Sequence, residues 1–270
     1  MFRIIQYVVL IFFALICLVP LLWVLANSLK TTREIALNPL GPPTTFNWQN
    51  YVEAWTVGRF SKYFANSVIV TIPIVVGTVV LSCLAGYGFA RFKLPGGKLV
   101  FYLFLLGLTV PFQSVMIPMY YLLRDTRLLE TYWAFIIPGI AIRLPFGIFL
   151  MRGFFRGLPP ELGDAARTDG ANEWGVFWQV FLPLSWPGLA TLIVFQFMWA
   201  WNEFAMPLIF VQRDQLRPVS LGTMFFFGRF TADRGMIAAG VTLSMIPVVI
   251  LYLFLQRRFI EGITAGALKS

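Results

Sequence analysis

The chain has 270 residues, of which 59% are hydrophobic and only 12% are charged. Soluble proteins carry about 25% charged residues, so this composition argues against a water-soluble fold and indicates a membrane protein. The net charge of +9 is dispersed between long apolar runs, which argues against a nucleic-acid-binding patch. Histidine is absent, so the usual metal ligand and the general base of common hydrolases are missing. We therefore expect neither a metal site nor catalysis on this chain.

Six stretches of the chain are long and apolar enough to cross a bilayer, which takes about 20 helical residues. They cover 4–29, 64–90, 99–123, 131–152, 187–211 and 236–256. Arg143 interrupts the fourth stretch, which spans the membrane only if its guanidinium faces protein or water. The first stretch is longer than a signal-peptide core and no small-residue cleavage site follows it, so we expect it to remain as the first span. The predicted fold is an all-α membrane protein of six spans, in a single domain over 1–270.

Six crossings place both termini on the same side of the membrane. Lysine and arginine are normally enriched on the cytoplasmic side. Here they divide evenly between the two sides, so the charge distribution does not determine the orientation.

The connection 156–186, between the fourth and fifth predicted spans, has the pattern of a structured segment. A proline pair at 159–160 favours the start of a helix, and Gly170 can take the left-handed conformation that ends one. We therefore expect a short helix over 160–169. A second short helix should follow it, with Asn172 as its N-terminal cap.

The first of these short helices has the composition of a docking element. Ala165 and Ala166 have almost no side chain, which lets the helix lie close against another surface. Charged side chains beside them are left to make contacts at the rim of such a surface. The residues that we expect to contact a partner are Glu161, Asp164, Ala165, Ala166, Arg167, Asp169 and Gly170.

These residues resemble the cytoplasmic signature of the membrane subunits of bacterial ATP-binding-cassette (ABC) importers, which reads E-A-A, three residues, G, nine residues, I-x-L-P. Asp164-Ala165-Ala166, Gly170, Val180 and Leu182-Pro183 stand at these spacings, with aspartate replacing the first glutamate and valine the isoleucine. Three further stretches resemble the carbohydrate branch of that family, specifically the second permease of maltose-type and glycerol-phosphate-type systems. They are the outer segment that ends near Asn50-Tyr51, the run 201–204 and the tail 259–269, of which the tail is the most specific.

The resemblance implies the type I ABC importer permease fold, with the helix over 160–173 coupled to one of two cytoplasmic ATPase subunits. It also implies a second permease subunit, an extracytoplasmic sugar-binding protein, and a bacterial or archaeal cytoplasmic membrane with both termini in the cytoplasm. ATP and Mg²⁺ then belong to the ATPase, because this chain has no nucleotide-binding sequence. Gly96-Gly97-Lys98 lacks the leading glycine and the Ser/Thr of a phosphate-binding loop and predicts a tight turn.

Sugar sites combine aromatic faces with amide and carboxylate groups, and the fifth span carries all three kinds. Gln196, Trp199 and Glu203 have the spacing of one helix face, whereas Trp201 and Asn202 point elsewhere. A rise of about 1.5 Å per residue places Arg143 and Glu203 at different depths, which argues against an ion pair between them. The candidate pathway residues are Gln113, Arg143, Gln196, Trp199, Asn202 and Glu203.

Two other kinds of transporter stay open at this point: an ABC importer of a solute other than sugar, and an ion-coupled secondary transporter. The second needs an intramembrane carboxylate for its coupling ion, and the spans offer only Glu203, near an edge. A membrane-embedded enzyme has no motif to support it.

Overall fold

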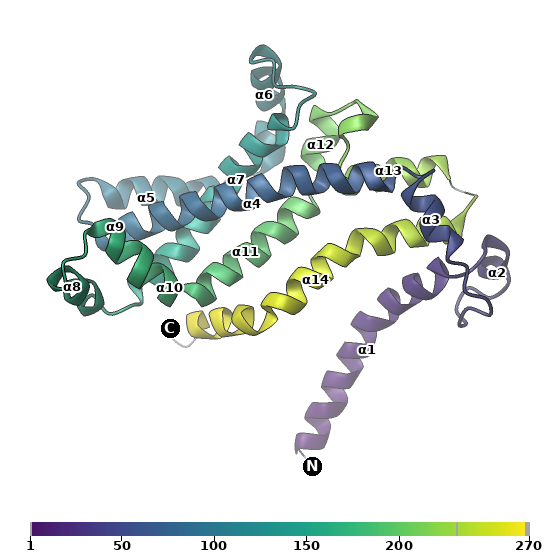
Figure 1. Cartoon of the computed structure of the whole chain (residues 1–270), viewed down its shortest axis with the longest axis horizontal. Helices are drawn as coiled ribbons and strands as arrows, with labels where there is room; N and C mark the ends of the chain where they lie inside the picture. Colours follow the sequence, from purple (N-terminus) through teal and green to yellow (C-terminus); the bar gives the residue numbers. More distant parts are fainter. Residues whose placement is uncertain (1, 231, 268–270) are drawn as a thin grey trace. The chain divides into compact units, whose positions relative to one another are not determined.

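The computed structural model describes residues 2–230 and 232–267, with side chains for all of these except 2, 225 and 258–267. The helices in chain order are α1 (Phe2–Ser28), α2 (Thr32–Leu37), α3 (Gln49–Trp55), α4 (Phe60–Arg91), α5 (Gly97–Leu106), α6 (Phe112–Asp125), α7 (Trp133–Arg156), α8 (Glu161–Thr168), α9 (Glu173–Gly175), α10 (Leu182–Leu184), α11 (Trp186–Trp201), α12 (Ala205–Phe210), α13 (Val219–Arg229) and α14 (Arg234–Ala267) (Figure 1). Short 3₁₀ turns cover Gly107–Thr109 and Asp214–Leu216, and a π-helical segment covers Val176–Phe181. The described residues contain no strand, which confirms the predicted all-α fold.

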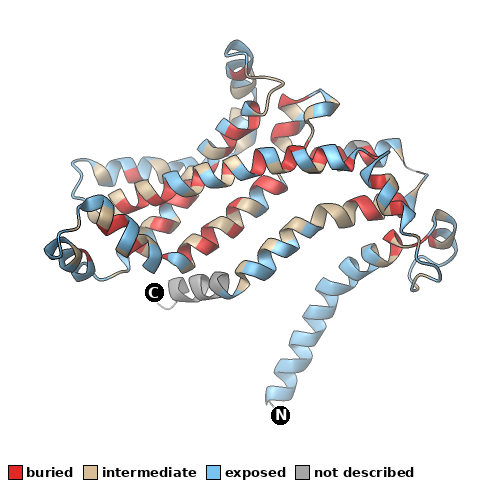
Figure 2. Ribbon diagram, in the orientation of Figure 1, coloured by how far each residue is buried: buried red, intermediate tan, exposed pale blue. Residues whose placement is uncertain are grey.

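Five helical stretches of the described chain are long and apolar enough to cross a membrane, or six if a bent pair counts as one span. The five are Arg3–Ser28, Phe60–Arg91, Trp133–Arg156, Trp186–Phe210 and Arg234–Arg257. They coincide with five of the six predicted spans. Helix α1 has no buried residue along its most apolar window and is exposed over most of its length (Figure 2). Such an apolar surface requires lipid or another membrane subunit around it.

The third predicted span, over 99–123, is bent rather than straight. Its two halves, Gly97–Thr109 and Phe112–Asp125, meet at 99°. Val110 and Pro111 between them have extended backbone. Proline has no N–H to continue a helical ladder and biases the preceding residue away from the helical region, which accounts for the break at this point.

The chain forms two compact units. One comprises the chain up to Asn66 together with Arg217–Pro247, and the other comprises Ser67–Leu216 together with the chain from Val248. The second unit contains the connection 156–186 and all the candidate pathway residues.

Asn50 organises the first unit around the end of α1. Its side-chain Nδ2 donates hydrogen bonds to the carbonyls of Ser28 and Lys30, each at 2.8 Å. The hydroxyls of Ser28 and Tyr51 lie 2.6 Å apart. These bonds satisfy carbonyls that a helix C-terminus leaves without intrahelical partners. The Asn50-Tyr51 stretch that resembles the carbohydrate branch therefore holds α1 to α3.

Small residues allow α7 to pack closely in the second unit. A Cβ atom at Gly139 would lie 2.8 Å from Ile74 of α4, and one at Gly147 would overlap the hydroxyl of Ser82 on the same helix. Leu192 of α11 lies against Gly147 as well. In membranes, close helix packing of this kind depends on small residues, because lipid supplies no hydrophobic driving force between helices.

Gly147→Ala should therefore destabilise the protein by about 1–3 kcal/mol, the usual cost of overpacking a well-packed core. The change is measurable as a lower thermal unfolding temperature in detergent. Gly153→Ala is the matched control, since Gly153 stands on the same helix with open space around its Cβ position. This control should be neutral or slightly stabilising, because alanine has the higher helix propensity. Equal unfolding temperatures for the two variants would contradict the packing account.

Candidate functional site

The connection between α7 and α11 folds as the sequence predicts. Helix α8 covers Glu161–Thr168, within the expected range of 160–169. Gly170 then has a φ of +90°, in the left-handed region that favours glycine. The Asn172 side chain accepts a hydrogen bond of 2.9 Å from the Gly175 backbone N–H and caps α9. Both predicted short helices and the glycine turn between them are confirmed.

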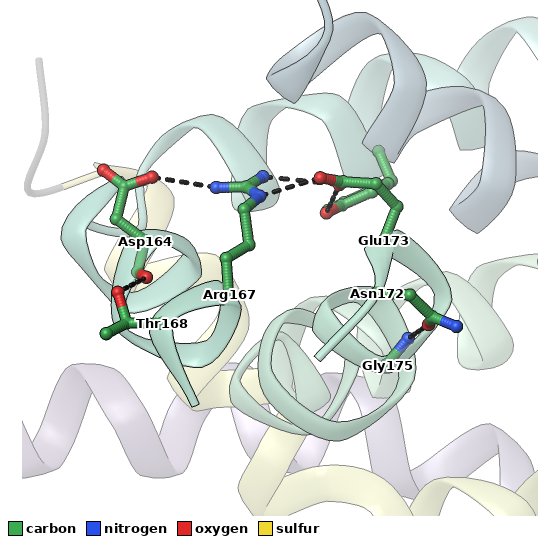
Figure 3. Close-up of polar contacts among 7 residues, drawn as sticks. Asp164, Arg167, Thr168, Asn172, Glu173 and Gly175 are labelled. Atoms are coloured by element: carbon green, nitrogen blue, oxygen red, sulfur yellow. Dashed lines mark hydrogen bonds and ion pairs between the residues drawn. The ribbon is translucent and has the colours of Figure 1, made fainter. Parts of the chain in front are cut away.

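Arg167 ties the two short helices together across this turn (Figure 3). Its Nη1 lies 2.8 Å from Asp164 Oδ1, and its Nε lies 2.7 Å from Glu173 Oε1. The hydrogen bond from Arg167 lowers the pKa of the Glu173 carboxyl below its ordinary value of 4.5, and in turn raises the pKa of Arg167. Because the pKa of Glu173 is lowered, the ion pair is present at neutral pH and is lost only as the pH falls through that lowered pKa.

The two alanines of α8 face in different directions. Ala166 packs against a buried apolar cluster of the second unit that includes four aromatic residues, here called the aromatic bed: Tyr87, Phe155, Phe177 and Phe181. Gly163 is also buried, and a Cβ there would lie 3.2 Å from the Phe181 ring. Ala165 is exposed. Ala166 therefore packs α8 against its own chain, whereas Ala165 faces outward. That both alanines contact a partner stays a prediction.

Arg91, the last residue of α4, contacts the beginning of the connection, where α7 ends. Its guanidinium donates hydrogen bonds to the carbonyls of Phe155 and Leu158, where α7 ends. The same group lies over the Phe181 ring, with its central carbon 4.1 Å from the ring centroid. It thus satisfies carbonyls at a helix C-terminus and adds a cation–π contact to the aromatic bed.

Arg143 and Glu203 form a buried ion pair elsewhere in the second unit. Arg143 Nη2 lies 2.9 Å from Glu203 Oε2, and the two side chains are 6% and 22% exposed. The same guanidinium donates to the backbone carbonyls of Gly139 at 3.0 Å and Trp199 at 3.1 Å. The depth argument against this pair was wrong.

The depth estimate counted Glu203 as part of a continuous helix, whereas Arg143 does lie within the helix α7. Helix α11 ends at Trp201, so the chain no longer climbs at the helical rise when it reaches Glu203. The Glu203 Oε1 atom accepts hydrogen bonds from the N–H groups of Ala205 and Met206, at 3.2 and 3.3 Å, and so begins α12. Arg143 has a long side chain, and helical side chains lean toward the N-terminus of their helix, which closes the remaining gap.

Of the other candidate pathway residues, Trp199 contacts this pair, and it does so through its backbone carbonyl. Gln196 has no exposed surface, and neither atom of its amide has a hydrogen-bond partner in the described part of the chain. Trp199 is 42% exposed, so it does not share an exposed face with Gln196. Gln113 and Asn202 are exposed. Their role in a pathway stays a prediction.

The family model for binding-protein-dependent transport system inner membrane components matches residues 78–264. The match begins within α4 and includes the connection 156–186, the aromatic bed and the Arg143–Glu203 pair. The chain belongs to this family. It is an ABC transporter permease, as the signature in the connection indicates.

Similar proteins agree with this assignment over nearly the whole permease. It is 35% identical to the diacetylchitobiose uptake system permease protein NgcG of Streptomyces coelicolor, over 99% of this chain and 89% of the relative. It is 34% identical to the arabinooligosaccharides transport system permease protein AraQ of Halalkalibacterium halodurans, over 96% and 94% of the two chains. A chain of a bacterial ABC transporter involved in alginate import has the same fold, with a TM-score of 0.81, 24% identity and 96% coverage of each chain.

Sequence reasoning missed two residues of the permease that position the connection. Arg91 looks like an ordinary basic residue at the end of a span, and Tyr87 like an ordinary span aromatic. In the structure Arg91 binds the end of α7, and the Tyr87 hydroxyl donates to Glu173 Oε2 at 3.5 Å. The available signal is weak: Arg91 is the first charged residue after the apolar run, and Lys93 follows it before the glycine turn at 96–97.

The Arg143–Glu203 pair should contribute strongly to stability, because removing one partner leaves a buried charge uncompensated. Arg143→Met and Glu203→Gln should each lower the stability of the permease by about 3 kcal/mol. The double variant should be more stable than the sum of the single effects predicts, since it leaves no unpaired charge. Thermal unfolding in detergent, followed by tryptophan fluorescence, measures the stability of the wild type, the two single variants and the double variant. Additive single effects would show that the two residues act independently.

Proposed function

We propose that this permease is a membrane subunit of an ATP-driven sugar importer and forms half of its translocation pathway. The relatives named above are permeases of diacetylchitobiose and arabinooligosaccharide systems, which supports an oligosaccharide as the solute. The family description, a binding-protein-dependent system, supports an extracytoplasmic binding protein as a partner. A second permease subunit completes the pathway, and two ATPase subunits drive it. ATP and Mg²⁺ bind those subunits, and no cofactor binds this chain.

The observation that carries the proposal is the seating of α8. Ala166 and Gly163 face the aromatic bed, while Leu162, Ala165 and Asp169 are exposed. A small, exposed residue at the centre of a firmly held helix lets a groove on another protein close around it. We infer that an ATPase subunit grips this outer face.

Movement of α8 would pass directly to the membrane spans. Arg91 joins the base of the connection to both α4 and α7, and the Arg167–Glu173 pair keeps α8 and α9 together. When the ATPase subunits close, they would draw α8 with them and tilt these spans as rigid bodies, so that the pathway opens to the other side of the membrane. The permease itself performs no chemical step.

This role fixes the orientation that the charge distribution left open. ATP is in the cytoplasm, so α8 and both termini would lie there, and the permease would be a multi-pass protein of a bacterial or archaeal cytoplasmic membrane. The predicted tail 259–269 would be on the same side; its residues 268–269, and the side chains of 259–267, lie outside the described part of the chain.

For the pathway we propose Trp199 as a sugar-stacking residue, because its ring is partly exposed and packs edge-on against Phe146, with the ring centroids 4.9 Å apart. The role of the Arg143–Glu203 pair is then to hold the Trp199 backbone in place. The alternative function, an ion-coupled secondary transporter, has less support from the structure than it had from the sequence. Its one candidate carboxylate, Glu203, is already neutralised by Arg143.

Ala165→Glu should leave the permease folded and in the membrane but reduce transport and the ATPase stimulation that accompanies it by at least about tenfold, since a charged side chain enters the proposed contact. Uptake into proteoliposomes measures transport, and co-purification with the ATPase subunits measures the contact itself. Ala165→Ser is the matched control and should retain most activity, because it keeps the small volume. Wild-type uptake by Ala165→Glu would contradict the assigned contact.

A further inference from the structure

We propose that a basic pocket beside the coupling connection binds the headgroup of an anionic phospholipid. The pocket has a volume of about 620 Å³ and lies in the second unit, where α4 ends, α5 begins and α7 ends. The transport role proposed above does not use it.

Four cations line the pocket and no carboxylate does: Lys93, Lys98, Arg152 and Arg156. None of the four forms an ion pair within the described part of the chain. Arg152 and Arg156 stand four residues apart on α7, where like charges repel. The cluster therefore gains stability from an anion in the pocket.

Arg152 is held in position for such a ligand. Its guanidinium lies over the Phe101 ring, 3.9 Å from the centroid, and its Nε donates to the Phe89 carbonyl at 3.4 Å. The cation–π contact leaves the other guanidinium N–H groups available. Lys93, Lys98 and Arg156 are exposed and free to close around a phosphate.

The surroundings select a lipid over a soluble anion. From the pocket, α5 continues as the first half of the bent span, and its side chains Leu99, Tyr102 and Leu103 are 65%, 62% and 57% exposed. Leu94, in the pocket wall, is 47% exposed. A ligand that fits both features carries negative charge at one end and hydrocarbon at the other. Basic pockets between spans at a membrane surface have this kind of ligand.

A lipid here would lie close to the coupling machinery. Arg152, which lines the pocket, is on the same turn of α7 as Phe155, which belongs to the aromatic bed. Phe92 of the pocket wall packs against Tyr87 of the aromatic bed, with ring centroids 5.6 Å apart. The site itself does not depend on the transport role. Only its assignment to the cytoplasmic leaflet rests on the orientation proposed above.

Native mass spectrometry of the full chain, released from detergent micelles, tests the proposal. Micelles are titrated with dioleoyl-phosphatidylglycerol or dioleoyl-phosphatidylcholine, and the one-to-one adduct is counted. The anionic lipid should bind at least about tenfold more tightly than the zwitterionic one. Lys98→Gln with Arg156→Gln should weaken phosphatidylglycerol binding about 20- to 30-fold, from about fivefold for each surface cation. Lys98→Gln alone should cost about fivefold and serves if the double variant does not fold.

Two control variants separate the pocket from general charge attraction. Lys98→Arg with Arg156→Lys conserves the charges and should bind phosphatidylglycerol as the wild type does. Lys62→Gln with Arg127→Gln removes two exposed cations that do not line the pocket, the first of them in the opposite terminal turn of α4, and should leave binding unchanged.

Four outcomes would overturn the proposal. Equal binding of the two lipids, or an equal loss in the remote control, would mean that no specific site exists. Displacement of the lipid by millimolar inorganic phosphate would assign the pocket to a soluble anion. If the pocket variants bind phosphatidylglycerol normally but no longer co-purify with the ATPase subunits, the pocket is a protein contact instead.

Discussion

The geometry of the connection depends on one interaction, the guanidinium of Arg91 at the end of α7. A helix that ends in a membrane surface layer leaves carbonyls without partners, and the chain must turn there to make α8. Arg91 donates to two of these carbonyls and lies over Phe181 at the same time. A single side chain on α4 therefore contacts both the end of α7 and the base of the connection.

The aromatic bed turns this fixed base into a platform. Tyr87 contacts Phe155, Phe177 and Phe181, with ring centroids 5.0–5.7 Å apart. Aromatic rings at such distances bury large areas and are stiff, because they have few rotatable bonds. The polar contacts of α8, in contrast, are exposed: Arg167 and Glu173 are 41% and 46% exposed. The apolar bed therefore supplies the stability, and the exposed ion pairs set the angle between α8 and α9.

A different constraint governs the membrane interior. Charges there are costly unless paired, and Arg143 meets this requirement with Glu203 and two backbone carbonyls. Close helix packing at Gly139 and Gly147 brings α4 against the same face of α7. The ion pair and the glycines together define how α4, α7 and α11 meet. Gln196 on α11 is buried, and neither atom of its amide has a hydrogen-bond partner in the described part of the chain, so the helix packing leaves this polar side chain unsatisfied.

Local features were predictable from the sequence because they depend on neighbouring residues. Apolar length determined the spans, and the proline pair, Gly170 and Asn172 determined the two short helices of the connection. The direction in which each side chain points, and its partners from distant segments, were not predictable. Ala165 and Ala166 are chemically identical, and only the position of the aromatic bed separates the outward residue from the inward one. Arg143 and Glu203 are 60 positions apart, and their pairing depends on where α11 ends, as the direction of the third span depends on the break at Pro111. Such relations arise from packing between distant segments, which hydropathy and spacing along one chain do not encode.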